Sequence, residues 1–157
     1  IAAGARIVRE TPDTGQFFAM FPGDVMVEFF GDPKLDAPVK HHHLHFASHQ
    51  VEEMRDWYAR VFGAVPGMRG RFKAADLPGV NLSWNTSETP ALPTRGRALD
   101  HIGFEVTDIK AFCAKLETSG IKLDMPPTPR PDLGLTIAFV TDPWGTRVEL
   151  TEGSAKF

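Results

Sequence analysis

Two stretches of the chain, His43-Leu44-His45-Phe46-Ala47-Ser48-His49-Gln50-Val51 and His101-Ile102-Gly103-Phe104-Glu105-Val106-Thr107-Asp108-Ile109, align with each other without a gap. The alignment sets His43 on His101, Phe46 on Phe104 and Val51 on Ile109. Each run has the alternation of a strand with one buried face, and then reaches a polar residue suited to begin a helix. Self-similarity of this kind indicates that one structural unit occurs twice.

An amphipathic helix is predicted after each of these strands. Apolar residues recur at three- and four-residue intervals from Val51 to Val61 and from Ile109 to Leu116, and glycines follow each pattern, at positions 63 and 120. Short β-like runs broken by Pro and Gly come next: 70–74 and 80–84 in the first module, and 121–124, 135–141 and 146–151 in the second. Each module therefore has the pattern β-α-β-β-β, and the sequence predicts an α+β fold. Residues 87–97 link the modules.

The N-terminal stretch resembles the end of such a module. Residues 17–28 are similar to 137–149, and 5–8 would match the strand predicted at 121–124. We therefore predict that 1–35 form a partial preceding module of two to three strands, followed by modules at 40–86 and 98–152. An ordinary N-terminal hairpin is the alternative. Because the chain begins with Ile rather than Met, we expect a longer parent protein or a trimmed start.

Composition limits the classes of partner. The chain has 157 residues, 42% of them hydrophobic, which is enough for a substantial core. The net charge is −3 and both signs are interleaved, so nothing indicates a nucleic-acid surface, and no apolar stretch approaches a membrane span. Cys113 is the single cysteine, which excludes an intrachain disulfide and a Cys-based zinc site and predicts a small buried helix residue. We expect a soluble protein with a small-molecule substrate, cytoplasmic, or periplasmic if the true N-terminus is missing.

These features resemble the vicinal-oxygen-chelate superfamily, which includes glyoxalase I, bleomycin-resistance proteins and extradiol dioxygenases. The resemblance rests on a histidine early in each module, on the helix end Trp57-Tyr58-Ala59-Arg60-Val61-Phe62-Gly63, and on Asp142-Pro143-Trp144-Gly145 ahead of Val148-Glu149-Leu150. It covers about residues 40 to 152, which would together form one domain. The resemblance implies that the two modules pair, that their mixed sheets curl into a half-open barrel, and that a divalent metal ion lies in the cavity.

The resemblance places the metal ligands at His43, His101 and Glu149. Two imidazoles and one carboxylate form the facial arrangement of non-haem Fe(II) oxygenases, although Mn, Ni, Co and Zn also suit these ligands. A carboxylate in an otherwise apolar strand also requires a partner, because burying an unpaired charge is costly. The family's fourth position, near Asn81 or Ser83, carries no carboxylate. That absence departs from the glyoxalase I pattern and agrees with the extradiol dioxygenases.

Two further polar residues share these faces if the strands are regular. His45 lies two residues from His43, and Glu105 lies four residues from His101. We predict that His45 either supports a metal ligand from behind or acts as an acid–base group, and that Glu105 holds substrate or orients a histidine. The alternative for both is a polar side chain that lines a wet cavity.

The sequence thus predicts a divalent-metal enzyme that binds two neighbouring oxygens of a small substrate, dioxygenase-like and with Fe(II). A glyoxalase- or epimerase-like lyase or isomerase is the second hypothesis. A metal-free binding protein of the drug-sequestering type is the third, and the retained ligands argue against it. We also expect a homodimer, because the orphan N-terminal strands leave sheet edges that need a neighbour.

Overall fold

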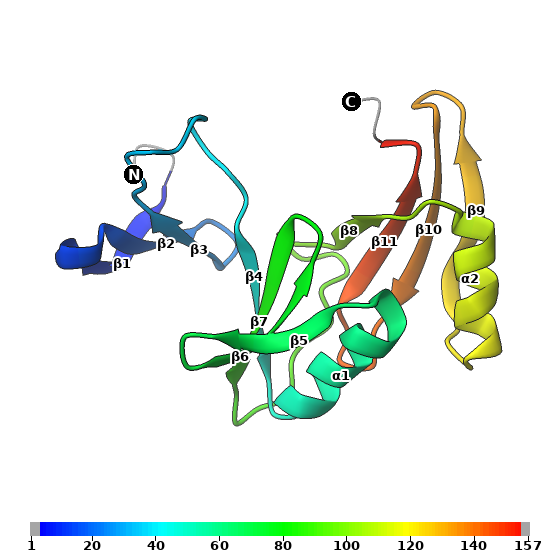
Figure 1. Cartoon of the computed structure of the whole chain (residues 1–157), viewed down its shortest axis with the longest axis horizontal. Coiled ribbons are helices and arrows are strands. Elements are labelled where there is room, and N and C mark those ends of the chain that lie inside the picture. Colours follow the sequence, from blue (N-terminus) through cyan, green and yellow to red (C-terminus); the bar gives the residue numbers. More distant parts are fainter. Residues whose placement is uncertain (1–3, 155–157) are drawn as a thin grey trace. The chain divides into compact units, whose positions relative to one another are not determined.

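The computed structural model describes residues 4–154, and the chain in it divides into two compact units (Figure 1). One unit comprises the chain up to His41 together with Gly96–Asp100. The other comprises His42–Arg95 and the chain from His101 onward, and it contains both of the repeated modules. The predicted site residues all belong to this second unit.

The first unit contains an antiparallel sheet of β1 (Arg6–Thr11), β2 (Gln16–Phe21) and β3 (Val25–Phe30), in that order, with the short 3-10 helix η1 (Pro12–Thr14) between β1 and β2. Phe17 on β2 stacks on Phe29 on β3 with 4.6 Å between ring centroids. The turn between β2 and β3 requires glycine, because Gly23 has φ +83° and a Cβ there would lie 2.5 Å from the Cβ of Ala98. Two to three strands were expected in 1–35; residues 1–3 lie outside the described part.

The first module of the second unit consists of β4 (His43–Ser48), α1 (Val51–Phe62), β5 (Val65–Arg69), β6 (Phe72–Leu77) and β7 (Val80–Thr86). Its sheet has the order β4-β7-β6-β5, with β4 parallel to β7. The predicted helix is confirmed, and it ends at Gly63 in the left-handed conformation, φ +75°. The sequence missed β5, because Pro66 and Gly67 are poor strand residues that only an edge strand such as β5 accommodates.

The second module repeats this topology with β8 (Ile102–Glu105), α2 (Ile109–Thr118), β9 (Leu123–Arg130), β10 (Leu135–Thr141) and β11 (Arg147–Glu152), in the sheet order β8-β11-β10-β9. The Asp108 carboxylate caps α2 by accepting the Ala111 N–H at 2.9 Å. β9 extends well beyond the predicted 121–124, since the prolines within it lie on an edge strand. The α+β fold with tandem βαβββ modules is therefore confirmed, while curling into a half-open barrel stays a prediction.

One apolar core joins the two modules. Each helix packs on one face of its own sheet, and α1 also contacts the second module. There the ring of Phe62 stacks on Phe112 and lies 5.1 Å from that of Phe104. Cys113 lies on α2 and is 2% exposed in this core, which confirms the predicted buried helix residue. Burial also raises the pKa of its thiol. Neither α1 nor α2, the α-helices of residues 4–154, has the length and apolar character of a membrane span.

A buried hydrogen bond connects the modules beside this core. The Tyr58 hydroxyl on α1 donates to Asp142 Oδ2 at 2.9 Å, across the 84 positions that separate the two residues. Asp142 Oδ1 accepts the backbone N–H groups of Trp144 and Thr146 at 2.9 and 2.8 Å, which holds the turn between β10 and β11. Burial raises the pKa of Asp142 above its ordinary value and that of Tyr58 well above its own. The turn that the sequence singled out thus fixes α1 against the second module.

Candidate metal site

His101 and Glu149 meet on the face of the second sheet that α2 leaves uncovered, called here the helix-free face. Glu149 Oε2 lies 2.9 Å from His101 Nε2, with side-chain exposures of 20% and 38%. Parallel pairing sets Glu149 opposite Gly103, two residues after His101. The carboxylate reaches the imidazole past a residue that has no side chain. The neighbours of Glu149 on β11, Val148 and Leu150, are fully buried on the helix side.

The separation of these two atoms also suits a shared metal ion. Two ligand atoms held about 2.1 Å from an ion and at right angles lie about 3 Å apart. The observed Nε2–Oε2 distance of 2.9 Å matches that spacing. An imidazole nitrogen beside a carboxylate oxygen suits Fe, Mn, Co, Ni or Zn. The spacing of the pair is therefore compatible with a shared divalent ion, and equally with a direct hydrogen bond between the imidazole and the carboxylate.

Arg147 and Phe139 complete this face around the carboxylate. Arg147 lies two positions before Glu149 on β11, and its guanidinium carbon is 3.9 Å from the centroid of the Phe139 ring. The His101 ring contacts the same phenyl ring edge-on at 5.4 Å. Alternation along a single strand does not predict the stacking of Arg147 on Phe139, because the pairing of β10 with β11 brings these two residues together. The Phe139 ring thus contacts both the guanidinium of Arg147 and the imidazole of His101, the two neighbours of Glu149 on this face.

In the first module, His43 and His45 share the corresponding helix-free face, as predicted. Their rings are perpendicular, with centroids 4.7 Å apart, and His43 Nδ1 lies 2.9 Å from His42 Nδ1. The His45 ring rests edge-on against Phe72 at 5.3 Å, and its Nε2 lies 3.5 Å from a guanidinium nitrogen of Arg69. Arg69 and Phe72 are thus neighbours of the His45 ring in this module.

Sequence reasoning missed Asp76. Ser83 Oγ donates to Asn81 Oδ1, and Asn81 Nδ2 donates to Asp76 Oδ1, both at 2.7 Å. The strand register sets His43 beside Asn81, and Asn81 beside Asp76. β7 lacks a carboxylate, as expected, but the adjacent β6 supplies one at the same level of the sheet. Only strand pairing reveals it, because Asp76 lies in the hairpin between two predicted strands.

The structure brings together two of the three predicted ligands. Within residues 4–154, His43, His101 and Glu149 do not form a group whose ligand atoms all lie within 4.8 Å of one another. Glu105 lies at the end of β8, where its carboxylate accepts the Gly153 N–H at 3.2 Å. This contact gives Glu105 a structural role at the end of β11. The convergence of the three ligands and the chemical roles of His45 and Glu105 stay predictions.

A protein-family model matches most of the second unit. The family described as the Glyoxalase/Bleomycin resistance protein/Dioxygenase superfamily matches residues 42–150. This range includes the first βαβββ module, the second module except the last two residues of β11, and each of the predicted ligands. The first unit lies almost wholly outside the match, apart from the segment Gly96–Asp100.

Solved structures with this fold are numerous. One is TioX from Micromonospora sp. ML1, with a TM-score of 0.57 and 21% identity over 73% of this chain and 98% of that one. Another is a member of the same superfamily from Sphaerobacter thermophilus, with a TM-score of 0.58 and 19% identity over 73% and 98%. At these identities the likeness concerns the fold.

A curated relative adds a likeness in sequence. A Synechocystis protein named as a probable lactoylglutathione lyase is 38% identical over 61 residues, which cover 39% of this chain. The matched region spans 47% of that relative, or about half its length.

Proposed function

The chain belongs to the glyoxalase/bleomycin resistance protein/dioxygenase superfamily, and on that premise we propose that it is a divalent-metal-dependent enzyme with dioxygenase-like chemistry. His101 and Glu149 are the first two ligands, and His43 on the equivalent strand of the other module is the third. Fe(II) is the favoured ion. The observation that carries the proposal is the contact between Nε2 of His101 and Oε2 of Glu149 at 2.9 Å.

The chemistry of the ion when bound would be that of a Lewis acid with open positions for two neighbouring substrate oxygens. The protein's own residues then bind and orient the substrate. Arg147, held over Phe139 beside Glu149, provides a cation for an anionic substrate such as a catecholate or a keto acid. His45 is the proposed proton carrier, because its Nε2 is on the helix-free face of the first module. Glu105 is proposed to contact substrate from the end of β8.

The β7 strand favours this reading over a four-ligand site. Ser83 occupies the strand where the family has a further ligand, it is fully buried, and its hydroxyl donates to Asn81. A site with three protein ligands leaves more positions for substrate and O₂, which is the requirement of a dioxygenase.

A lyase of the lactoylglutathione type is the second candidate. It is supported by the name of the Synechocystis relative. A lyase would use the same three residues with Zn, Ni, Co or Mn and would need no oxygen.

The test begins with metal analysis of the purified chain and continues with two assays. We expect about one equivalent of Fe(II) per chain, a higher melting temperature on metal addition, and O₂ uptake with a catechol or an α-keto acid. Turnover of a hemithioacetal without O₂ would show lyase activity and contradict the proposed dioxygenase activity. Absence of bound metal, together with no thermal shift on adding Fe, Mn, Co, Ni or Zn ions, would contradict both enzymes and leave a metal-free binding protein.

Mixing two variants that do not bind metal can determine whether the third ligand, His43, comes from the same chain or from a second copy. In the described part of one chain His43 does not join His101 and Glu149, so we expect a second copy to supply it in a homodimer. A mixed dimer of His43→Ala and His101→Ala chains then carries one site with both histidines intact. Metal binding should therefore reappear after the variants are unfolded and refolded together. If His43 acts within its own chain, no mixed dimer has an intact site and metal binding stays absent.

A further inference from the structure

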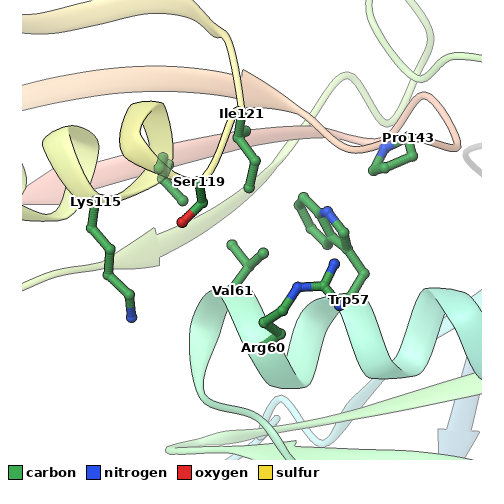
Figure 2. Close-up of a pocket in the computed structure, with 8 residues that line it drawn as sticks. Trp57, Arg60, Val61, Lys115, Ser119, Ile121 and Pro143 are labelled. Atoms are coloured by element: carbon green, nitrogen blue, oxygen red, sulfur yellow. The ribbon is translucent and has the colours of Figure 1, made fainter.

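The second unit contains a cavity of about 320 Å³ between α1 and the C-terminal end of α2 (Figure 2). It is large enough for a small organic molecule, since ligand pockets begin at about 300 Å³. Residues from both modules line it, and none of those residues is part of the candidate metal site. The proposed function leaves this cavity unused.

The floor of the cavity is apolar and held rigidly. Trp57 and Val61 of α1 are 6% and 5% exposed, and Ile121 approaches them from the second module. The Trp57 ring makes edge-on contacts with the Tyr58 and Phe62 rings at 5.1 and 5.7 Å between centroids. Because these neighbours fix the indole, the apolar surface is already formed and does not need to be ordered by a ligand.

Two cations stand at the rim of the cavity, one from each module. Arg60 comes from the last turn of α1 and Lys115 from the last turn of α2. Within residues 4–154 neither side chain forms an ion pair or a hydrogen bond. Asp56, one helical turn from Arg60, contacts Arg55 instead, at 2.9 Å. Among the described residues, therefore, no carboxylate pairs with either charge at the rim.

A hydroxyl group adds a neutral donor to these charges. Ser119, the residue that caps the C-terminal end of α2, directs its side chain into the cavity in Figure 2. Cations in the last turn of a helix also interact favourably with the helix dipole. The helix dipole accounts for the presence of a cation in the last turn of either helix. It does not account for an apolar cavity that lies between the two cations.

We propose that this cavity binds a small organic anion with an apolar body, of which an aromatic monocarboxylate is the simplest example. Its ring packs on Trp57 and Val61, and its carboxylate lies between Arg60 and Lys115. Charge-assisted hydrogen bonds to arginine and lysine are stronger than neutral ones, so they supply the specificity for an anion. Because each module contributes one cation, the bound anion stabilises the packing of the modules against each other.

The test uses benzoate as the probe and benzamide as its uncharged counterpart, with binding followed by ligand-observed NMR and by the melting temperature. We expect saturable benzoate binding that is about tenfold weaker in each of Arg60→Gln and Lys115→Gln, the loss of one charged hydrogen bond. Ser119→Phe should abolish binding by filling the cavity. The matched control is Lys110→Gln, which removes one positive charge from the exposed side of α2 away from the cavity.

Glu149→Gln separates this site from the metal site, because it changes only the latter. Unaltered benzoate binding in Glu149→Gln supports the proposal, whereas loss of binding there means that benzoate binds the metal. Equal binding of benzamide, equal weakening by Lys110→Gln, or no saturable benzoate binding would each overturn the anion site. So would variants of Arg60 and Lys115 that lower the melting temperature but leave benzoate affinity unchanged, since that result assigns both residues to the helix dipoles alone.

Discussion

Metal affinity is expected to fall by at least about 100-fold when His101 is replaced by alanine, because changes even to groups behind the ligands cost 10- to 100-fold. His101→Ala removes one of two groups that already lie at ligand spacing, 2.9 Å apart. Its side chain is 38% exposed, so the fold should survive and the melting temperature of the metal-free protein should hardly change. The measurement is metal content per chain after dialysis against a defined metal concentration, together with the melting temperature with and without metal.

His49→Ala is the control for this experiment. His49 is exposed in the segment between β4 and α1 and precedes the helix by two residues, so its loss removes a histidine without touching the helix-free faces. Glu149→Gln should reproduce the result of His101→Ala, since an amide is a much weaker ligand than a carboxylate. Unchanged metal content in His101→Ala would exclude His101 from the site, and an equal loss in His49→Ala would show that binding to surface histidines was being measured.

The strands and helices were predictable where one face is buried. The period of two in β4 and β8 and the spacing of three and four in α1 and α2 follow from burial against one continuous core, and so they are visible in the sequence. β5 was not visible, because an edge strand needs neither alternation nor β-branched residues. The face of each candidate ligand followed from the same alternation, which is why His43, His45, His101 and Glu149 lie on helix-free faces.

The sequence pattern did not predict which side chains of neighbouring strands contact each other. Asp76 lies beside Asn81, and Arg147 over Phe139, because of the register in which neighbouring strands pair. The residue pattern along a single strand does not contain that register. The repeat predicted equivalence of His43 and His101 but not their distance, because equivalence in two modules is a relation of sequence, whereas convergence depends on how two sheets face each other. The Tyr58–Asp142 hydrogen bond was not predictable for the same reason, since its partners belong to two separate motifs of the sequence, 57–63 and 142–145.

The largest effect on stability is expected from Asp142→Ala, which should lower the free energy of unfolding by roughly 3–5 kcal/mol. The carboxylate is 4% exposed and accepts three hydrogen bonds, two from the turn backbone and one from Tyr58. Alanine removes the carboxylate that accepts from the buried Tyr58 hydroxyl and frees the turn between β10 and β11. Urea denaturation followed by tryptophan fluorescence measures the loss, and a loss below about 1 kcal/mol would mean that the modules do not depend on this contact.

Two conservative variants measure separately how much the Tyr58 hydrogen bond and the carboxylate of Asp142 contribute to the free energy of unfolding. Tyr58→Phe should cost about 1–2 kcal/mol, because it removes one donor and keeps the ring packing. Asp142→Asn should cost about 1 kcal/mol, because its amide oxygen can still accept from the turn and its nitrogen can donate to Tyr58. If the contact joins the modules, the losses in Tyr58→Phe and Asp142→Ala will not add in the double variant.

The charge of Asp142 gives this contact a pH dependence with a definite sign. Burial raises the pKa of Asp142 above its ordinary value of 3.8, so the folded state binds a proton more readily than the unfolded state. Between the ordinary and the raised pKa, the contribution of this carboxyl to the free energy of unfolding falls as pH rises, because the unfolded state loses its proton first. Asp142→Asn has no such proton and lacks this fall. Its stability relative to the unaltered protein should therefore improve as pH rises through that window, and a constant difference between the two proteins would show that the carboxyl has the same pKa in both states.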